Sequence, residues 1–134
     1  MPKIKQVNHI AIVVEDIDDW LAFWRDALGI ELSEMREVPA EKSKIAFLPL
    51  TDGEIELVQP TTIDSGIARY LSKHGQGLHH VCLEVDDIDG MLDQLKARGV
   101  RLINKQPRTA TDGKRYAFIH PESASGVLVE LYQL

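Results

Sequence analysis

The stretch "NHIAIVVEDID" (residues 8–18) is repeated later in the chain as "HHVCLEVDDID" (residues 79–89), and this repeat decides the fold. Adding 71 to a position in the first copy gives its counterpart in the second, so that His9 corresponds to His80. A period of this length is too long for a solenoid, whose repeats span about 20 to 50 residues. The pattern instead predicts a duplicated module with a histidine near the start of each copy.

The repeat continues through the rest of each half. The same offset carries Ala46-Phe47-Leu48 onto Ala117-Phe118-Ile119, and an offset of 74 carries "IELVQ" (55–59) onto "VELYQ" (129–133). Between these strands, apolar residues recur at helical spacing and end at a glycine. We therefore predict an α+β fold with two βαβββ modules in tandem, in one domain over residues 1–134: module 1 at about 4–60, a linking helix at about 61–77 and module 2 at about 78–134.

Residues that favour helix ends support this division. Asp16 and Asp87 precede the two amphipathic runs and are predicted to cap them, because a carboxylate accepts hydrogen bonds from the first free backbone N–H groups of a helix. Ser65 is predicted to begin the linking helix, and Gly75 to end it. Trp20 and Trp24 follow the apolar stripe of the first helix, so we expect them to pack in the core.

The composition is that of an ordinary globular protein, with 44% hydrophobic and 27% charged residues. The net charge of −6 argues against a nucleic-acid partner, and no apolar run approaches the roughly 20 residues of a membrane helix. The one cysteine, Cys82, excludes an internal disulfide and fits a reducing compartment. We expect a cytoplasmic protein with no nucleic-acid and no membrane partner.

Alternation within the strands places polar side chains on the faces that point away from the helices. Because alternate residues of a strand share a face, His9 points away from the helix while Ile10 points toward it. The second copy repeats this pattern and puts His80, Cys82 and Glu84 on its outward face.

Glu56 and Glu130 each lie inside an otherwise apolar strand, and burying a lone charge there costs several kcal/mol. A bound divalent cation would remove that cost. Two imidazoles and two carboxylates suit a transition metal with open coordination positions. A single histidine at such a position is usually structural, and a single glutamate usually faces solvent. Because both residues recur at equivalent places in the two halves, we favour a shared metal site at His9, Glu56, His80 and Glu130.

These residues resemble the vicinal oxygen chelate superfamily, also called the glyoxalase/bleomycin-resistance/dioxygenase fold. Its members pair two βαβββ modules into a cup-shaped mixed sheet around a metal. Within it, "GLHHVCLEVDDID" (77–89) and "HPESASGVLVEL" (120–131) are most similar to the methylmalonyl-CoA epimerases. The metal ligands of that family match His9, Glu56, His80 and Glu130. The resemblance implies one divalent ion, with cobalt as first choice and manganese, nickel, zinc or iron as alternatives.

The resemblance implies epimerisation of methylmalonyl-CoA at C2, by removal of the proton and its return to the opposite face through a metal-stabilised enolate. It implies that Glu130 is one base as well as a ligand. The third-strand carboxylate of some family members falls on Ala46, so the second base is open between Glu56, which we prefer, and a metal-bound water. For binding the acyl-CoA substrate, the candidates are Lys44, Lys114, Arg115 and His120.

Two other functions of the same fold are alternatives. One is a glyoxalase I-like isomerase or lyase acting on a glutathione hemithioacetal, although "HPESASG" (120–126) replaces the "DPDG"-like turn typical of that group. The other is a non-enzymatic binding or resistance protein, although such proteins often lack the metal ligands. Members of the superfamily are commonly homodimers, so the expected partners are an acyl-CoA and a second copy of the chain.

Overall fold

The computed structural model describes residues 1–134, and the chain divides into two compact units. Unit 1 comprises residues 1–9 and 80–134, and unit 2 comprises residues 10–79. Two strands contribute residues to both units, β1 (Ile4–Val13) and β5 (Gly77–Val85). The predicted modules and their boundaries stay a prediction.

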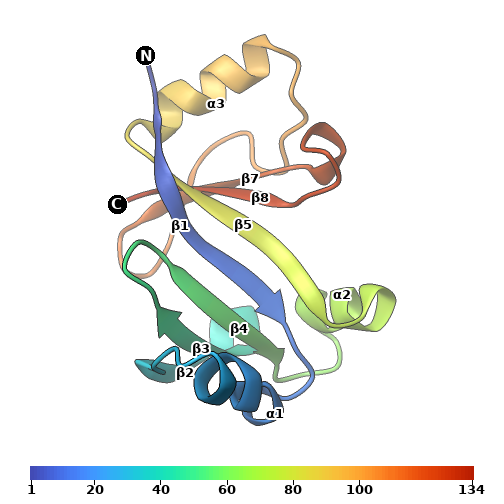
Figure 1. The fold of residues 1–134 in the computed structure, drawn as a ribbon. Helices are drawn as coiled ribbons and strands as arrows, with labels where there is room; N and C mark the ends of the chain where they lie inside the picture. Colours follow the sequence, from blue (N-terminus) through green and yellow to red (C-terminus); the bar gives the residue numbers. More distant parts are fainter. The chain divides into compact units, whose positions relative to one another are not determined.

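Unit 2 contains strands in the order β2-β3-β4-β1. β2 (Glu34–Val38), β3 (Ser43–Pro49) and β4 (Glu54–Pro60) pair antiparallel and run side by side in Figure 1. One face of these strands is apolar because alternate residues point toward α1 (Ile17–Leu21), where Ile17 and Leu21 pack with Leu48 and Leu57. The opposite face, which α1 does not cover, carries the remaining side chains of β4, Glu56 among them.

Unit 1 contains strands in the order β1-β5-β8-β7-β6. β8 (Val129–Gln133) is parallel to β5 and antiparallel to β7 (Arg115–Ile119), and the short β6 (Arg108–Thr109) pairs with β7. Apolar residues of α3 (Ile88–Ala97) pack with one face of these strands, where Ile88 and Leu92 meet Leu131. The α+β class predicted from the sequence is confirmed.

The predicted helix caps at Asp16, Ser65, Gly75 and Asp87 are confirmed. The Asp16 carboxylate accepts from the N–H of Asp18 and the Asp87 carboxylate from that of Gly90, each at 3.0 Å. The linking helix is α2 (Gly66–His74), where the Ser65 hydroxyl accepts from the backbone and Gly75, at φ 78°, ends the helix in the left-handed region. None of the helices is both long enough and apolar enough to span a membrane.

The first amphipathic run differs from the regular helix that its spacing predicts. The α-helix ends at Leu21, and a π-helical turn (Ala22–Ala27) follows, in which the Leu28 N–H donates to the Phe23 carbonyl five residues back at 2.9 Å. The wider turn moves later residues off the apolar stripe, and Leu28 is 53% exposed. Trp24 packs against the core as expected. Trp20 is instead 38% exposed, and its indole N–H donates to the Gln76 side chain at 2.8 Å.

Candidate metal site

Three of the predicted ligands lie on three strands of unit 1. His9 is on β1, His80 on β5 and Glu130 on β8. The neighbouring residue Leu131 faces α3, so strand alternation turns Glu130 to the opposite face. The parallel pairing of β5 with β8 sets Cys82 directly beside Glu130. The sequence therefore folds so that polar side chains meet on the face that the helix does not cover.

The ligand atoms of these three side chains converge. The Nε2 atoms of His9 and His80 are 3.1 Å apart, and the Glu130 Oε1 atom lies 3.1 Å from that of His80 and 3.5 Å from that of His9. Two ligand atoms about 2.1 Å from one ion, at angles of roughly 90° to 110°, are about 3.0–3.4 Å apart. The three atoms thus have the spacing of ligands to a single metal ion. All three side chains are close to buried, at 9%, 13% and 11% exposure.

Cys82 belongs to the same group of side chains. Ligand atoms of His9, Cys82 and Glu130 lie within 4.8 Å of one another, and Cys82 is fully buried. The sequence places Cys82 on the outward face of its strand but does not select it as a ligand, because it has no counterpart in the first copy of the repeat, where Ala11 stands. The structure thus offers a His-Cys-Glu group that can hold a metal ion, with His80 beside it.

The two imidazoles control the charge of Glu130. Burial by itself raises the pKa of this carboxyl group, but the neighbouring imidazoles of His80 and His9 outweigh burial and lower the pKa from 4.5 to about 2. Glu130 is therefore an anion throughout the physiological range. An anionic oxygen beside two imidazole nitrogens is a donor set that suits a divalent transition metal.

Further side chains surround the three ligands. The Asn8 Oδ1 atom lies 2.8 Å from His9 Nδ1, the ring edge that faces away from the site. The rings of His9 and Tyr132 meet edge to face at 6.4 Å, as do those of His80 and Phe118 at 5.6 Å. Sequence analysis missed these contacts. The position of Tyr132 two residues after Glu130 on the same strand face was the available signal.

Glu56, the fourth predicted ligand, belongs to unit 2. It lies half-buried on β4 between the buried Ile55 and Leu57, on the face away from α1, and it pairs in register with Phe47 of β3. The predicted alternation of this strand is therefore present, with the carboxylate on the outward face. The ligand role of Glu56 stays a prediction.

The four candidates for substrate binding have different surroundings. Lys44 is half-buried on β3 of unit 2. In unit 1, the Lys114 ammonium lies 5.6 Å from the centre of the Tyr132 ring, the same ring that contacts His9, and 3.5 Å from Asp112. Arg115 forms a two-pronged ion pair with Asp89 at 2.7 and 3.0 Å. His120 accepts a hydrogen bond from the N–H of Glu122 at 3.0 Å, which caps the 3-10 turn Pro121–Ser123.

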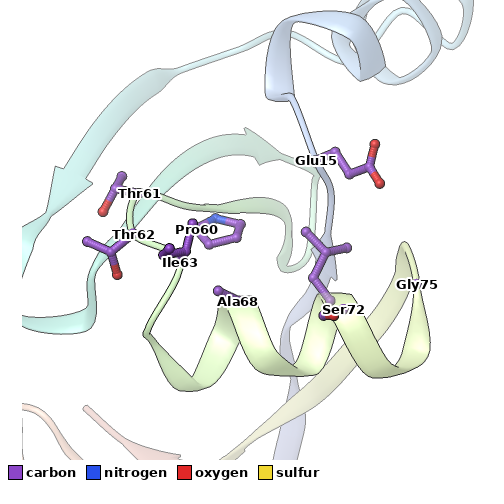
Figure 2. Close-up of a pocket in the computed structure, with 9 residues that line it drawn as sticks. Glu15, Pro60, Thr61, Thr62, Ile63, Ala68, Ser72 and Gly75 are labelled. Carbon is purple, nitrogen blue, oxygen red and sulfur yellow. The ribbon is translucent and has the colours of Figure 1, made fainter.

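A separate open pocket of about 560 Å³ lies within unit 2. Figure 2 shows residues that line it, where Ala68 of α2 lies near Pro60 and Ile63. None of the predicted metal ligands or basic residues lines this pocket, whose full lining is Glu15, Pro60, Thr61, Thr62, Ile63, Ala68, Leu71, Ser72 and Gly75.

Comparison with known proteins agrees with the fold. The chain is 37% identical over 133 residues to an ethylmalonyl-CoA/methylmalonyl-CoA epimerase of Cereibacter sphaeroides, covering 98% of this chain and 99% of the relative. It is 36% identical over 132 residues to the mitochondrial methylmalonyl-CoA epimerase of Mus musculus, covering 98% and 74%. A solved structure of a methylmalonyl-CoA epimerase in complex with methylmalonyl-CoA and NH4+ superposes with a TM-score of 0.87 at 29% identity, covering 98% and 95%.

The resemblance to epimerases that the sequence predicts is therefore confirmed by relatives that match almost the whole chain. The family model described as Glyoxalase/Bleomycin resistance protein/Dioxygenase superfamily matches residues 8–118, which include both copies of the repeated strand and helix. On these grounds the chain belongs to the Glyoxalase/Bleomycin resistance protein/Dioxygenase superfamily.

Proposed function

We propose that this chain is an epimerase that inverts C2 of methylmalonyl-CoA. The observation that carries the proposal is the convergence of His9 Nε2, His80 Nε2 and Glu130 Oε1 at 3.1 to 3.5 Å from one another, in a chain whose relatives are named for this reaction. The convergence supports a metal-dependent reaction over a binding role, because open imidazole and carboxylate sites of this kind are typical of catalytic metals.

The reaction requires a proton to leave C2, which lies between a thioester and a carboxylate, and to return on the other face. A bound divalent metal would supply a Lewis acid for the negative charge that develops on the thioester oxygen. His9, His80 and Glu130 would hold it. The donor set also accepts the family's candidate metals, and we keep cobalt as first choice with manganese, nickel, zinc and iron as alternatives.

Glu130 is the proposed base on one face of C2. Its carboxylate is ionised and close to buried, so it is ready to accept a proton without first losing one. Glu56 is proposed as fourth ligand on its match to the family's ligand set and its repeat equivalence with Glu130, and as second base on that equivalence. Glutamine keeps an oxygen that can bind a metal but cannot act as a base, so Glu56→Gln and Glu130→Gln separate the two roles.

The basic side chains are proposed to bind the anionic parts of the acyl-CoA. Lys114 is the strongest of the four, because it contacts Tyr132 and that ring contacts His9. Arg115 is held by Asp89 and would have to exchange that partner for a phosphate. Lys44 and His120 are proposed from the sequence. We also propose, on the resemblance, that the protein is a cytoplasmic homodimer.

The test measures exchange of the C2 proton of (2R)- and (2S)-methylmalonyl-CoA with solvent deuterium, using protein stripped by a chelator and then reloaded with cobalt. We expect epimerisation to vanish on chelation and to return with the metal. A glutathione hemithioacetal is the control substrate and should not turn over. Turnover of the control alone would replace the proposal with a glyoxalase I-like function, and metal-loaded protein that turns over neither substrate would favour a binding protein.

The base roles are tested with the same assay. We expect Glu130→Gln to lower epimerisation by about 10²- to 10⁴-fold, the usual contribution of one acid–base group. Glu56→Gln should have a similar effect if it is the second base. Full activity of Glu56→Gln, with cobalt still bound, would assign it a ligand role only.

A further inference from the structure

Glu84 is a buried carboxylate of unit 1 that the proposed chemistry does not use. Its side chain is 5% exposed and contacts three nitrogen donors that precede His9 on β1. The Asn8 amide nitrogen lies 3.3 Å and the Gln6 amide nitrogen 3.4 Å from Oε1, and the Lys5 ammonium lies 3.5 Å from Oε2. A carboxylate with three N–H donors remains an acceptor of hydrogen bonds.

This contact determines which end of the Asn8 side chain faces His9. An ionised carboxylate can only accept, so the Asn8 NH₂ group must point toward Glu84. The Asn8 carbonyl oxygen then points the other way, where it lies 2.8 Å from His9 Nδ1. A carbonyl oxygen cannot donate, so His9 Nδ1 must carry the proton. The lone pair of the neutral ring is then on Nε2, the atom that faces His80 and Glu130.

We propose that Glu84, acting through Asn8, holds His9 in the tautomer whose Nε2 atom can bind a metal. Glu84 and Asn8 are positioning residues, because neither has a place among the converging ligand atoms. The proposal deepens the metal site of the proposed function. It does not depend on the substrate, because metal binding and the ring tautomer are both measured without any acyl-CoA.

The repeat explains why this link acts on one histidine only. The counterparts of Asn8 and Glu84 at the offset of 71 are His79 and Val13. Val13 is a fully buried apolar residue whose side chain accepts no hydrogen bond, and the His79 ring packs against Tyr70 at 4.6 Å. The link to His9 is therefore a feature of one half of the chain and cannot be found by comparing the two copies.

The first experiment is a cobalt titration against a competing chelator, with variants of the same shape. In Glu84→Gln the new amide can face Asn8 with either end, so Asn8 can turn over and donate to His9 Nδ1. We expect cobalt affinity to fall by about 10- to 100-fold, the usual effect of losing such an outer partner. Glu122→Gln is the matched control, because it makes the same substitution at an exposed carboxylate of unit 1 that pairs with Arg101, and it should change affinity by less than about twofold.

The double variant Asn8→Asp/Glu84→Gln exchanges the hydrogen-bond donor and acceptor between the two positions. It tests whether the direction of this hydrogen bond matters for His9. The amide introduced in place of Glu84 can donate to the carboxylate introduced in place of Asn8, and that carboxylate also accepts from His9 Nδ1. We therefore expect cobalt affinity to return to within about threefold of the original protein. A merely structural role of Glu84 predicts no such recovery. Cobalt affinity of Glu84→Gln within about twofold of the original would overturn the proposal.

The second measurement reads the tautomer directly from ¹⁵N NMR of the His9 ring in metal-free protein, at a pH where the same spectra show the ring to be neutral. We expect the proton on Nδ1 in the original protein, and a large fraction on Nε2 in Glu84→Gln. A proton on Nε2 in the original protein would overturn the inference even if the variants failed to fold. Protein that binds no cobalt but keeps the Nδ1 proton would refute the metal site and leave the positioning of His9 intact.

Discussion

Glu130 is a close-to-buried carboxylate whose charge is maintained by His80 and His9. Its pKa is lowered from 4.5 to about 2 in the folded chain, so the folded state binds the proton less readily than the unfolded state does. The stability that this difference contributes is complete above about pH 4.5 and is lost as the pH falls through 2.

We therefore expect metal-free protein to lose stability between pH 4.5 and 2 more steeply than its Glu130→Gln variant does. The measurement is the midpoint of urea denaturation across this range for both proteins. Parallel curves would mean that the imidazoles do not stabilise the charged form of Glu130.

Ser43 is a second residue with an unusual environment. It is 2% exposed on β3, and its hydroxyl oxygen has no hydrogen-bond partner. Leaving a buried hydroxyl unpaired costs about 1–3 kcal/mol, and alanine removes the hydroxyl with little change in side-chain volume. We expect Ser43→Ala to raise the free energy of unfolding by about 1 kcal/mol in chemical denaturation. A loss of stability of that size would show that the hydroxyl is in fact paired.

At the scale of the elements, one contact ties the last strand of each half to its helix. The Gln59 side chain at the end of β4 accepts from the N–H of Ile17 at 2.9 Å, and Gln133 at the end of β8 accepts from the N–H of Ile88 at 2.7 Å. These glutamines are counterparts in the sequence repeat. The duplication is thus preserved down to the hydrogen bonds at the start of each helix.

We expect Gln133→Ala and Gln59→Ala each to lower the free energy of unfolding by about 1–2 kcal/mol, because each leaves a backbone donor without its acceptor. Gln106→Ala, at an exposed position, is the control and should have almost no effect. Denaturation curves of the three variants decide this. Equal stability in all three would mean that water replaces the lost acceptors.

Local signals predicted the elements well where the cause was local. The caps at Asp16, Asp87 and Ser65 depend on residues two or three positions away, and the structure has all three. The π-helical turn after Leu21 was not predicted, because the apolar spacing of the first run fits a regular helix. Periodicity reports which face is apolar and cannot report a local change of pitch.

The candidate site was also predictable only where its residues follow a pattern in the sequence. The repeat and the strand alternation identified His9, His80 and Glu130, which the structure brings together. The contact of Asn8 with Glu84 joins residues 76 positions apart and has no counterpart in the other half, so no periodic pattern contains it. Cys82 was placed on the correct face, but its nearness to Glu130 depends on the parallel register of β5 and β8.

At the scale of the whole molecule, the converging ligands predict where a metal stabilises the chain. An ion that binds only the folded state, present at about 100 times its dissociation constant, adds about 2.7 kcal/mol. We expect cobalt to slow amide exchange in β5 and β8 of unit 1, measured by hydrogen exchange and mass spectrometry.

The same exchange experiment tests Glu56. If it is the fourth ligand, protection should rise in β4 as well. A rise confined to unit 1 would remove Glu56 from the ligand set, and uniform protection throughout the chain would indicate global stabilisation without a local site.

Unit 1 joins the first nine residues of the sequence to residues 80–134, and this has a consequence for biosynthesis. The ribosome delivers His80 71 residues after His9, and Glu130 only with the last strand of the unit. A nascent or truncated chain that lacks β8 has two imidazoles without their carboxylate. Stable metal uptake would then require β8, so that a bound ion would distinguish chains that contain this strand from chains interrupted before it.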